Sequence, residues 1–138
     1  MSNLAGFLKP TYTEKTVEID ISDRFLDDNG EPLHFKLKTL TQEQMQQIAK
    51  RSIKEKVVNG KKVQEVDKLQ HLARCIVESC IQPDFKDRDL CLANGTEDPV
   101  ELPQKMLLVS EYEKLTRAFL DLNGLTGDSP EFGEVSKN

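Results

Sequence analysis

Near the start of the chain, apolar and polar positions alternate in two short segments that flank a turn at Asp28-Asn29-Gly30. An alternation of period two is typical of strands that bury one face. The polar positions are acidic in the first segment and basic in the second, which favours pairing of the strands side by side. The sequence therefore predicts an antiparallel hairpin. Its expected apolar positions are Val17, Ile19, Ile21, Leu33, Phe35 and Leu37.

After this hairpin, a three- and four-residue spacing predicts a helix that begins at a capping box of Thr41 and Gln44 and runs to about Lys56. Asn59-Gly60 then lies between two short β-branched runs, which is a strong signal for a tight turn between strands. We expect this segment to form a small ribbon or loop that joins two helices. The apolar positions of the first helix are Met45, Ile48, Ala49 and Ile53.

The clearest helix in the chain has Asp67 as its predicted cap and ends at Pro83. A further helical turn or two is expected between residues 87 and 94, with Asn94-Gly95 as the stop. The apolar positions of the clearest helix are Leu69, Leu72, Ala73, Ile76, Val77, Cys80 and Ile81.

Two more helices are expected before residue 124. Asp98-Pro99 and Pro103 are alternative starts for the first of them. Ser110 and Glu113 form a capping box ahead of the second, which ends at Asn123-Gly124. Its expected apolar face holds Tyr112, Leu115, Phe119 and Leu122.

These elements predict an α+β fold, in which an N-terminal antiparallel β-hairpin packs on a small helical domain. The chain of 138 residues is long enough to bury a real core. We expect three parts: an extended N-terminal arm over residues 1–13, a single α+β domain over 14–124, and a tail over 125–138. The tail is rich in Gly, Ser, Pro and acidic residues, so it is predicted to be flexible and disordered.

Charge and composition narrow the class of partner. The net charge is −5, from 24 acidic and 19 basic residues, whereas a nucleic-acid binder usually shows a basic excess. Basic residues gather only between residues 50 and 62, where Glu55 interrupts them and no aromatic side chain is available to stack on bases. No nucleic-acid partner is therefore expected. The absence of an apolar run of about 18 residues argues against a membrane span.

The N-terminus lacks the pattern of a signal peptide, and three cysteines, an odd number, fit a reducing compartment. We therefore expect the protein in the cytoplasm.

The residues that could carry chemistry do not form a recognisable catalytic or metal-binding pattern. Cys75, Cys80 and Cys91 lack the close spacing of zinc ligands. His71 and Cys75 lie four residues apart, but nothing in the sequence supplies the lowered thiol pKa that a nucleophile needs. Residues 27–30 resemble part of a calcium loop, but the ligand positions one and twelve would be Phe25 and Lys36. The sequence thus predicts no catalytic residue, no metal site and no cofactor, and favours a non-catalytic binding module.

Apolar residues outside the periodic faces are the best candidates for contact with a partner. Leu4, Phe7 and Leu8 lie in the arm, and Phe132 and Val135 lie in the tail. We take these five residues as the candidate partner-binding set.

An ordered set of short motifs extends from Leu4 to Gly124. With them, the chain resembles the XkdN-like tail assembly chaperones of phages and prophages in Gram-positive bacteria. It departs from that family in the longer, more basic link at 59–62 and in Val109, where Pro is common. The matching residues are Leu4-x-x-Phe7-Leu8-Lys9, Ser22-Asp23-Arg24-Phe25-Leu26-Asp27, Gly30, Pro32, Phe35, Thr41-x-Glu43, Lys105-Met106-Leu107-Leu108, Glu111-Tyr112, Leu115 and Leu122-Asn123-Gly124.

This resemblance implies a phage tail assembly chaperone that binds the tape measure protein and assists polymerisation of the tail tube subunits without catalysis. It also implies absence from the mature virion, and as further partners the major tail tube protein and a frameshifted longer form of the chain itself. Codons for Ser136-Lys137-Asn138 can form a slippery heptamer. The sequence leaves open whether the chain forms a homo-oligomer. The alternatives are a structural tail component, such as a tail completion or connector protein, and a small regulatory or nucleic-acid-binding protein carried by the prophage.

Overall fold

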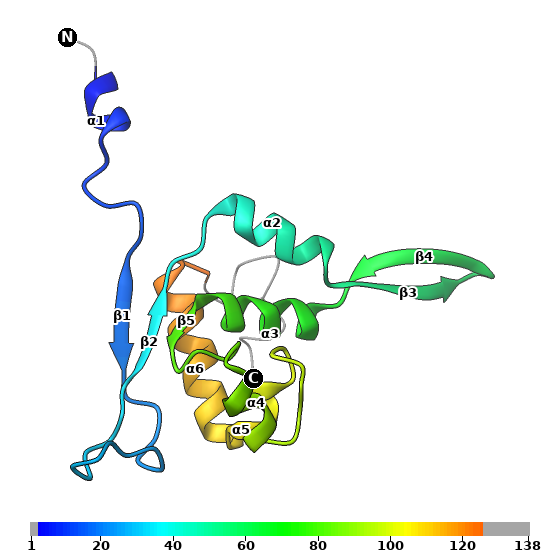
Figure 1. Cartoon of the computed structure of the whole chain (residues 1–138). Helices are drawn as coiled ribbons and strands as arrows, with labels where there is room; N and C mark the ends of the chain where they lie inside the picture. The colour runs from blue at the N-terminus through cyan, green and yellow to red at the C-terminus, as the bar shows by residue number, and fades with distance from the viewer. Residues whose placement is uncertain (1–2, 126–138) are drawn as a thin grey trace.

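The computed structural model describes residues 3–125 of the chain, and it shows the predicted combination of antiparallel strands and helices (Figure 1). Three strands form one sheet in the order β1-β2-β5, and two further strands, β3 and β4, form a separate hairpin. The elements in chain order are α1 (Leu4–Leu8), β1 (Thr16–Ile19), β2 (Phe35–Lys38), α2 (Gln42–Lys50), β3 (Ile53–Val58), β4 (Lys61–Val66), α3 (Lys68–Ser79), β5 (Cys80–Gln82), α4 (Arg88–Ala93), α5 (Leu102–Met106) and α6 (Val109–Leu122).

The predicted N-terminal hairpin is present as β1 and β2. Glu18 lies directly opposite Lys36, and its carboxylate is 3.9 Å from the lysine ammonium, so the expected pairing of opposite charges is confirmed. The prediction for Leu33 is wrong, because this side chain is exposed and precedes the strand. The backbone N–H of Leu33 donates to the carbonyl of Phe25 and thus belongs to the loop between the strands.

The third strand of the sheet was not expected. The helix predicted to reach Pro83 ends at Ser79, and Cys80–Gln82 pair with β2 instead. The hydroxyl of Ser79 donates to the carbonyl of Lys38, which fastens the end of α3 to β2. Pairing with the second edge of β2 satisfies backbone groups that one more helical turn would leave facing the strand.

The first helix is shorter than predicted. It begins at the expected capping box of Thr41 and Gln44 but ends at Lys50, so Ile53 lies in β3 and its side chain is exposed. The Asn59-Gly60 turn explains the difference. Both residues have positive φ, 53° and 78°, and this two-residue turn pairs six residues on each side, including Ile53 with Val66.

The helix starts near the end of the domain differ in part from the prediction. Asp67 caps α3 as expected, and Asp87, where the next helical segment was expected to begin, caps α4. α5 begins at Leu102, and Asp98 caps only a turn before it. The box predicted at Ser110 and Glu113 is wrong, because the backbone N–H of Leu108 donates to the carboxylate of Glu111, one helical position after Ser110.

One hydrophobic core joins the sheet to the helices. The inner faces of β1 and β2 pack against α6, and α3 lies between α2 and α6. Outside this core, Figure 1 shows two projections: α1 stands apart from the domain at the N-terminal end, and β3–β4 extends from the junction of α2 and α3. The largest fully buried side chains are Phe35, Leu37, Ile48, Leu72, Cys75, Ile76, Phe85, Leu102, Pro103, Leu115 and Phe119.

The described part of the arm contains the short helix α1, where an extended segment was expected. The division into arm, domain and tail stays a prediction, and the tail beyond residue 125 lies outside the described residues.

Candidate partner-binding surfaces

An open groove of about 520 Å³ lies between α3, the end of α5 and α6. Apolar side chains from all three elements form most of its wall, as expected of a site that binds an apolar partner. We call this surface the α3–α6 groove. Its lining residues are Leu69, Leu72, Gln104, Leu107, Val109, Tyr112, Glu113, Thr116, Arg117 and Leu120.

Two apolar residues at the rim of this groove are unusually exposed. Leu69 is 68% exposed and Val109 is 86% exposed. Leu69 was predicted to face the core, and this is wrong because it lies in the first turn of α3, one turn before the buried Leu72. No periodic signal marked Val109 as a contact residue: it follows Leu108, which is also exposed, and the expected apolar face of this helix begins only at Tyr112.

The groove also holds a polar group without a partner. The hydroxyl of Thr116 is buried in the wall and makes no hydrogen bond, whereas the nearby Glu113 and Arg117 pair with each other at 2.9 Å across one helical turn. Buried polar groups in proteins are nearly always satisfied. A partner that fills the groove could therefore supply a hydrogen bond as well as apolar contact.

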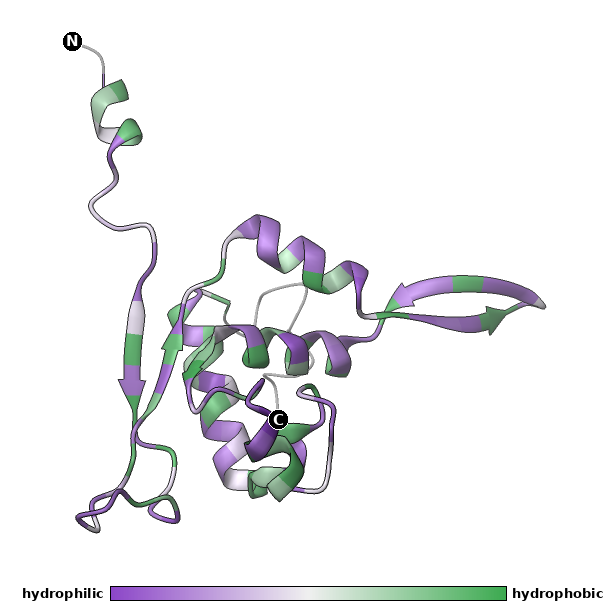
Figure 2. Cartoon of the chain, in the orientation of Figure 1, coloured by the Kyte–Doolittle hydropathy of each residue, from purple (hydrophilic) through white to green (hydrophobic). Residues whose placement is uncertain are grey.

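The arm presents a second apolar surface. α1 has no buried residue, and Phe7 and Leu8 are 82% and 70% exposed. Leu4, Phe7 and Leu8 fall at i, i+3 and i+4, so they share one face of this helix. Figure 2 shows α1 as a largely apolar segment set apart from the domain. The structure thus places these three candidate residues together, away from the groove, while Phe132 and Val135 lie outside the described residues.

A polar cleft separates the loop between β1 and β2 from the start of α6. Arg24 donates from Nε and Nη2 to the two carboxylate oxygens of Glu111, at 2.9 and 2.5 Å, and also to the carbonyl of Met106. Glu111 is almost fully buried. The hydrogen bonds from Arg24, together with those from Ser22 and the backbone of Leu108, hold its pKa at about 2. The ionised carboxylate of Glu111 therefore holds the loop between β1 and β2 against α6.

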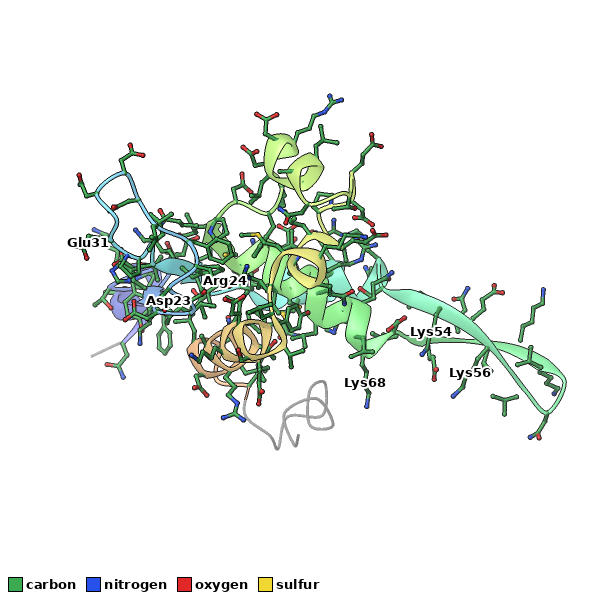
Figure 3. The ribbon with its side chains drawn as sticks, turned by 90° about the horizontal axis from the view of Figure 1, so that it is seen from below. Asp23, Arg24, Glu31, Lys54, Lys56 and Lys68 are labelled. Atoms are coloured by element: carbon green, nitrogen blue, oxygen red, sulfur yellow. The ribbon has the colours of Figure 1, made fainter. Side chains whose placement is uncertain are left out.

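Both partners of this pair lie in the short motifs noted in the sequence, but nothing in the sequence connects the two residues. Arg24 and Glu111 are separated by 87 positions, and only the fold brings them together. In Figure 3, Arg24 lies beside Asp23 and Glu31 at the end of the molecule opposite the β3–β4 hairpin.

The cysteines offer no nucleophile. Cys75, Cys80 and Cys91 are free and buried. Burial raises the pKa of Cys75 and of Cys80 to about 12, and it also raises that of Cys91. These thiols therefore stay protonated near neutral pH and lack the reactivity of a catalytic thiolate.

Neither a metal site nor a membrane span emerges from residues 3–125. That part of the chain contains no group of three or more His, Cys, Asp or Glu side chains placed to hold a metal ion. None of its helices is both long enough and apolar enough to cross a bilayer. The acidic segment at 27–30 forms a turn, in which one carboxylate oxygen of Asp27 accepts the N–H groups of Asn29 and Glu31.

Comparison with known proteins identifies the family of the chain. The family described as phage XkdN-like tail assembly chaperone protein matches residues 4–136 of the chain. Among curated proteins of Bacillus subtilis (strain 168), the phage-like element PBSX protein XkdN is 34% identical over 130 residues, which cover 93% of this chain and 88% of XkdN. The uncharacterized protein YqbN of the same strain is 35% identical over 130 residues, covering 93% and 87%.

A solved structure shares the fold. The crystal structure of YqbN superimposes with a TM-score of 0.74 at 31% identity, covering 90% of this chain and 98% of that chain.

Proposed function

Because this chain belongs to the family of phage XkdN-like tail assembly chaperones, we propose that it holds the tape measure protein in a soluble state while tail tube subunits polymerise around it. Several copies cover apolar helical surface on the tape measure and leave as tube subunits replace them. Mass action alone can drive this exchange, without catalysis or nucleotide hydrolysis.

The α3–α6 groove is the observation that carries this proposal. It is open, mostly apolar and bounded by two helices, which is the geometry that accepts one face of an amphipathic helix. Leu69 and Val109 at the rim add apolar area that the free protein leaves in water. The unpaired hydroxyl of Thr116 gives the groove a polar contact that a helix side chain can meet.

The arm supplies a second contact in this proposal. Phe7 and Leu8 project from a short helix that lies apart from the domain (Figure 1). This apolar face offers the tape measure a second contact, separate from the groove. The same proposal places the protein in the host cytoplasm, leaves it out of the finished virion, and admits the tail tube protein and a frameshifted longer form as further partners.

Co-expression with the tape measure protein of the same phage tests the proposal. We expect the wild-type chain to raise the soluble yield of the tape measure and to copurify with it in several copies. A groove variant, Leu69→Glu with Val109→Glu, should weaken this binding about tenfold or more, because it places charge where apolar contact is needed. An arm variant, Phe7→Ser with Leu8→Ser, should reduce the copurified amount as well.

The matched control is Leu26→Glu with Leu92→Glu, which changes two exposed leucines away from both surfaces. It should behave as the wild type. A tape measure that stays insoluble and unbound with every variant, wild type included, contradicts the proposal. Recovery of the chain in purified virions, by mass spectrometry, would instead favour a structural tail component such as a completion or connector protein.

A further inference from the structure

The β3–β4 hairpin and the residues at its base carry a concentration of positive charge on an acidic protein. Residues 50–68, which we call the basic projection, contain seven Lys and Arg residues and three carboxylates, a net charge of +4 in a chain of net charge −5. Figure 3 shows Lys54 and Lys56 on the part of the hairpin that extends away from the domain. The rest of the chain therefore carries a net charge of −9.

This hairpin gains little support from its own chain. All of its strand residues except Glu65 are exposed, and its contacts with other elements are few. A two-stranded hairpin alone in water is marginally stable. Lys54 and Lys56 pair with Glu65 at 3.8 and 2.9 Å, but Lys61 and Lys62 near the tip pair with no carboxylate of the described residues.

The complementary charge lies on another part of the same molecule. Residues 84–101, which we call the acidic lobe, contain six carboxylates and two basic residues, a net charge of −4. All six carboxylate residues are exposed. Three of them, Asp84, Asp87 and Asp98, lie close enough to the buried Cys91 to act on its thiol, so they converge on one patch.

The two charged surfaces cannot meet within one molecule. In Figure 1 the hairpin extends away from α4, the helix that belongs to the lobe. We propose that the basic projection of one copy docks on the acidic lobe of a second copy. Because the contact joins two different surfaces, one bound copy keeps a free lobe and the other keeps a free projection, so the association can continue head to tail.

The charge pattern also favours a second copy of the chain over nucleic acid as the partner of the basic projection. The projection has no aromatic side chain to stack on bases, and Glu55 and Glu65 interrupt its positive charge. The surrounding negative charge of the domain repels a polyanion but attracts the projection of another copy. The inference concerns the chain alone and does not depend on the tape measure proposal.

Charge reversal in both surfaces tests the contact. The projection variant is Lys61→Glu with Lys62→Glu, and the lobe variant is Asp89→Lys with Glu97→Lys. The two lobe residues are chosen because Asp87 and Asp98 accept capping hydrogen bonds and must be kept. The control, Lys105→Glu with Lys114→Glu, makes the same charge change as the projection variant but at exposed positions outside both surfaces. Far-UV circular dichroism checks that each variant is folded.

Sedimentation equilibrium of the purified chain gives the readout. At about 50 mM salt we expect the wild type and the control to exceed the monomer mass of 15.7 kDa, and to approach it at about 500 mM, where screening is strong. Each reversed variant alone should associate at least about tenfold more weakly. An equimolar mixture of the two variants should regain mass above the monomer, because the unchanged projection of the lobe variant, at net +4, can dock on the unchanged lobe of the projection variant, at net −4.

Three results would overturn this inference. They are a wild type that stays monomeric at low salt, variants that associate as strongly as the wild type, and a mixture that shows no recovery. Salt-sensitive binding of the monomeric wild type to a short DNA duplex, lost in the projection variant, would also overturn it and assign the projection to nucleic acid.

Discussion

At the residue scale, the pair of Arg24 and Glu111 shows how one buried charge can hold two distant segments together. The carboxylate is buried at the start of α6, and the guanidinium reaches it from the loop between β1 and β2. Removal of either partner from such a pair destabilises the fold, because the other charge is left without compensation. The geometry therefore fixes the loop only while Glu111 is ionised.

The pH dependence of stability should report this carboxylate. Its pKa is about 2 in the folded protein, against an ordinary value of 4.5, so its contribution is complete above about pH 4.5 and is lost as the pH falls toward 2. We expect Glu111→Gln to be less stable than the wild type at pH 7, and the difference to shrink between pH 4.5 and 2. Urea unfolding midpoints across this range measure it.

The control for this prediction is Glu113→Gln, which removes an exposed carboxylate from the same helix. It should leave the pH dependence close to that of the wild type. Parallel curves for the wild type and Glu111→Gln through the acid range would show that the pair does not titrate as described.

At the scale of one element, the β3–β4 hairpin depends on its turn more than on the core. Asn59 and Gly60 both adopt positive φ, and a side chain at Gly60 would meet no neighbouring atom within 4 Å. The demand for glycine is thus conformational and not a matter of space. Since the hairpin makes few contacts with the domain, damage to the turn should remain local.

We expect Gly60→Val to disfavour the turn by about 1–2 kcal/mol, because a β-branched residue is strained at this φ. Amide hydrogen exchange in β3 and β4 should accelerate. The free energy of global unfolding should change by less than about 0.5 kcal/mol. Gly6→Val, at an open position in α1, is the matched control and should leave hairpin exchange unaltered. Equal loss of protection in α3 and α6 would contradict a local effect.

At the scale of the whole molecule, the sheet and the helices share one core, and Leu37 lies at its centre. It is fully buried on β2, opposite Val17 on one side and Cys80 on the other. The strand pairs and the helices should therefore lose stability together when this side chain is cut back.

We expect Leu37→Ala to lower the free energy of unfolding by about 2–5 kcal/mol, the range for a buried leucine. Far-UV circular dichroism and the fluorescence of the partly buried Tyr112 should follow one urea transition. Leu33→Ala, at an exposed position, should cost less than about 1 kcal/mol. Separate transitions for the two probes would show that the sheet and the helices unfold independently.

Two errors in the predicted elements share one origin. Cys80–Gln82 continue an apolar helical repeat, yet they form a strand because β2 offers an unpaired edge. Ile53 fits the repeat of the preceding helix, yet the register set by Asn59-Gly60 places it in β3. In each case pairing with another segment overrode the local helical periodicity. A short window along the sequence contains no information about such pairing.

For the candidate surfaces, sequence and structure contributed different parts. Phe7 and Leu8 were identified because they lie outside any periodic face, and they are exposed. The α3–α6 groove was missed, because its wall combines residues from three helices and its rim includes Leu69, which fits the apolar repeat of α3. A groove is a property of the spacing between elements, so no single element reveals it.

The sequence by itself determined the α+β class, the first hairpin with its charge pairing, the caps at Thr41 and Asp67, and the tight turn at Asn59-Gly60. These features depend on residues close together in the chain or on a simple period. Only the tertiary structure decided the third strand, the partnership of Arg24 with Glu111, and the separation of a basic projection from an acidic lobe. Those features involve segments tens of residues apart in the chain. Their free energies arise from burial of side chains and from short distances between groups that only the folded chain brings together.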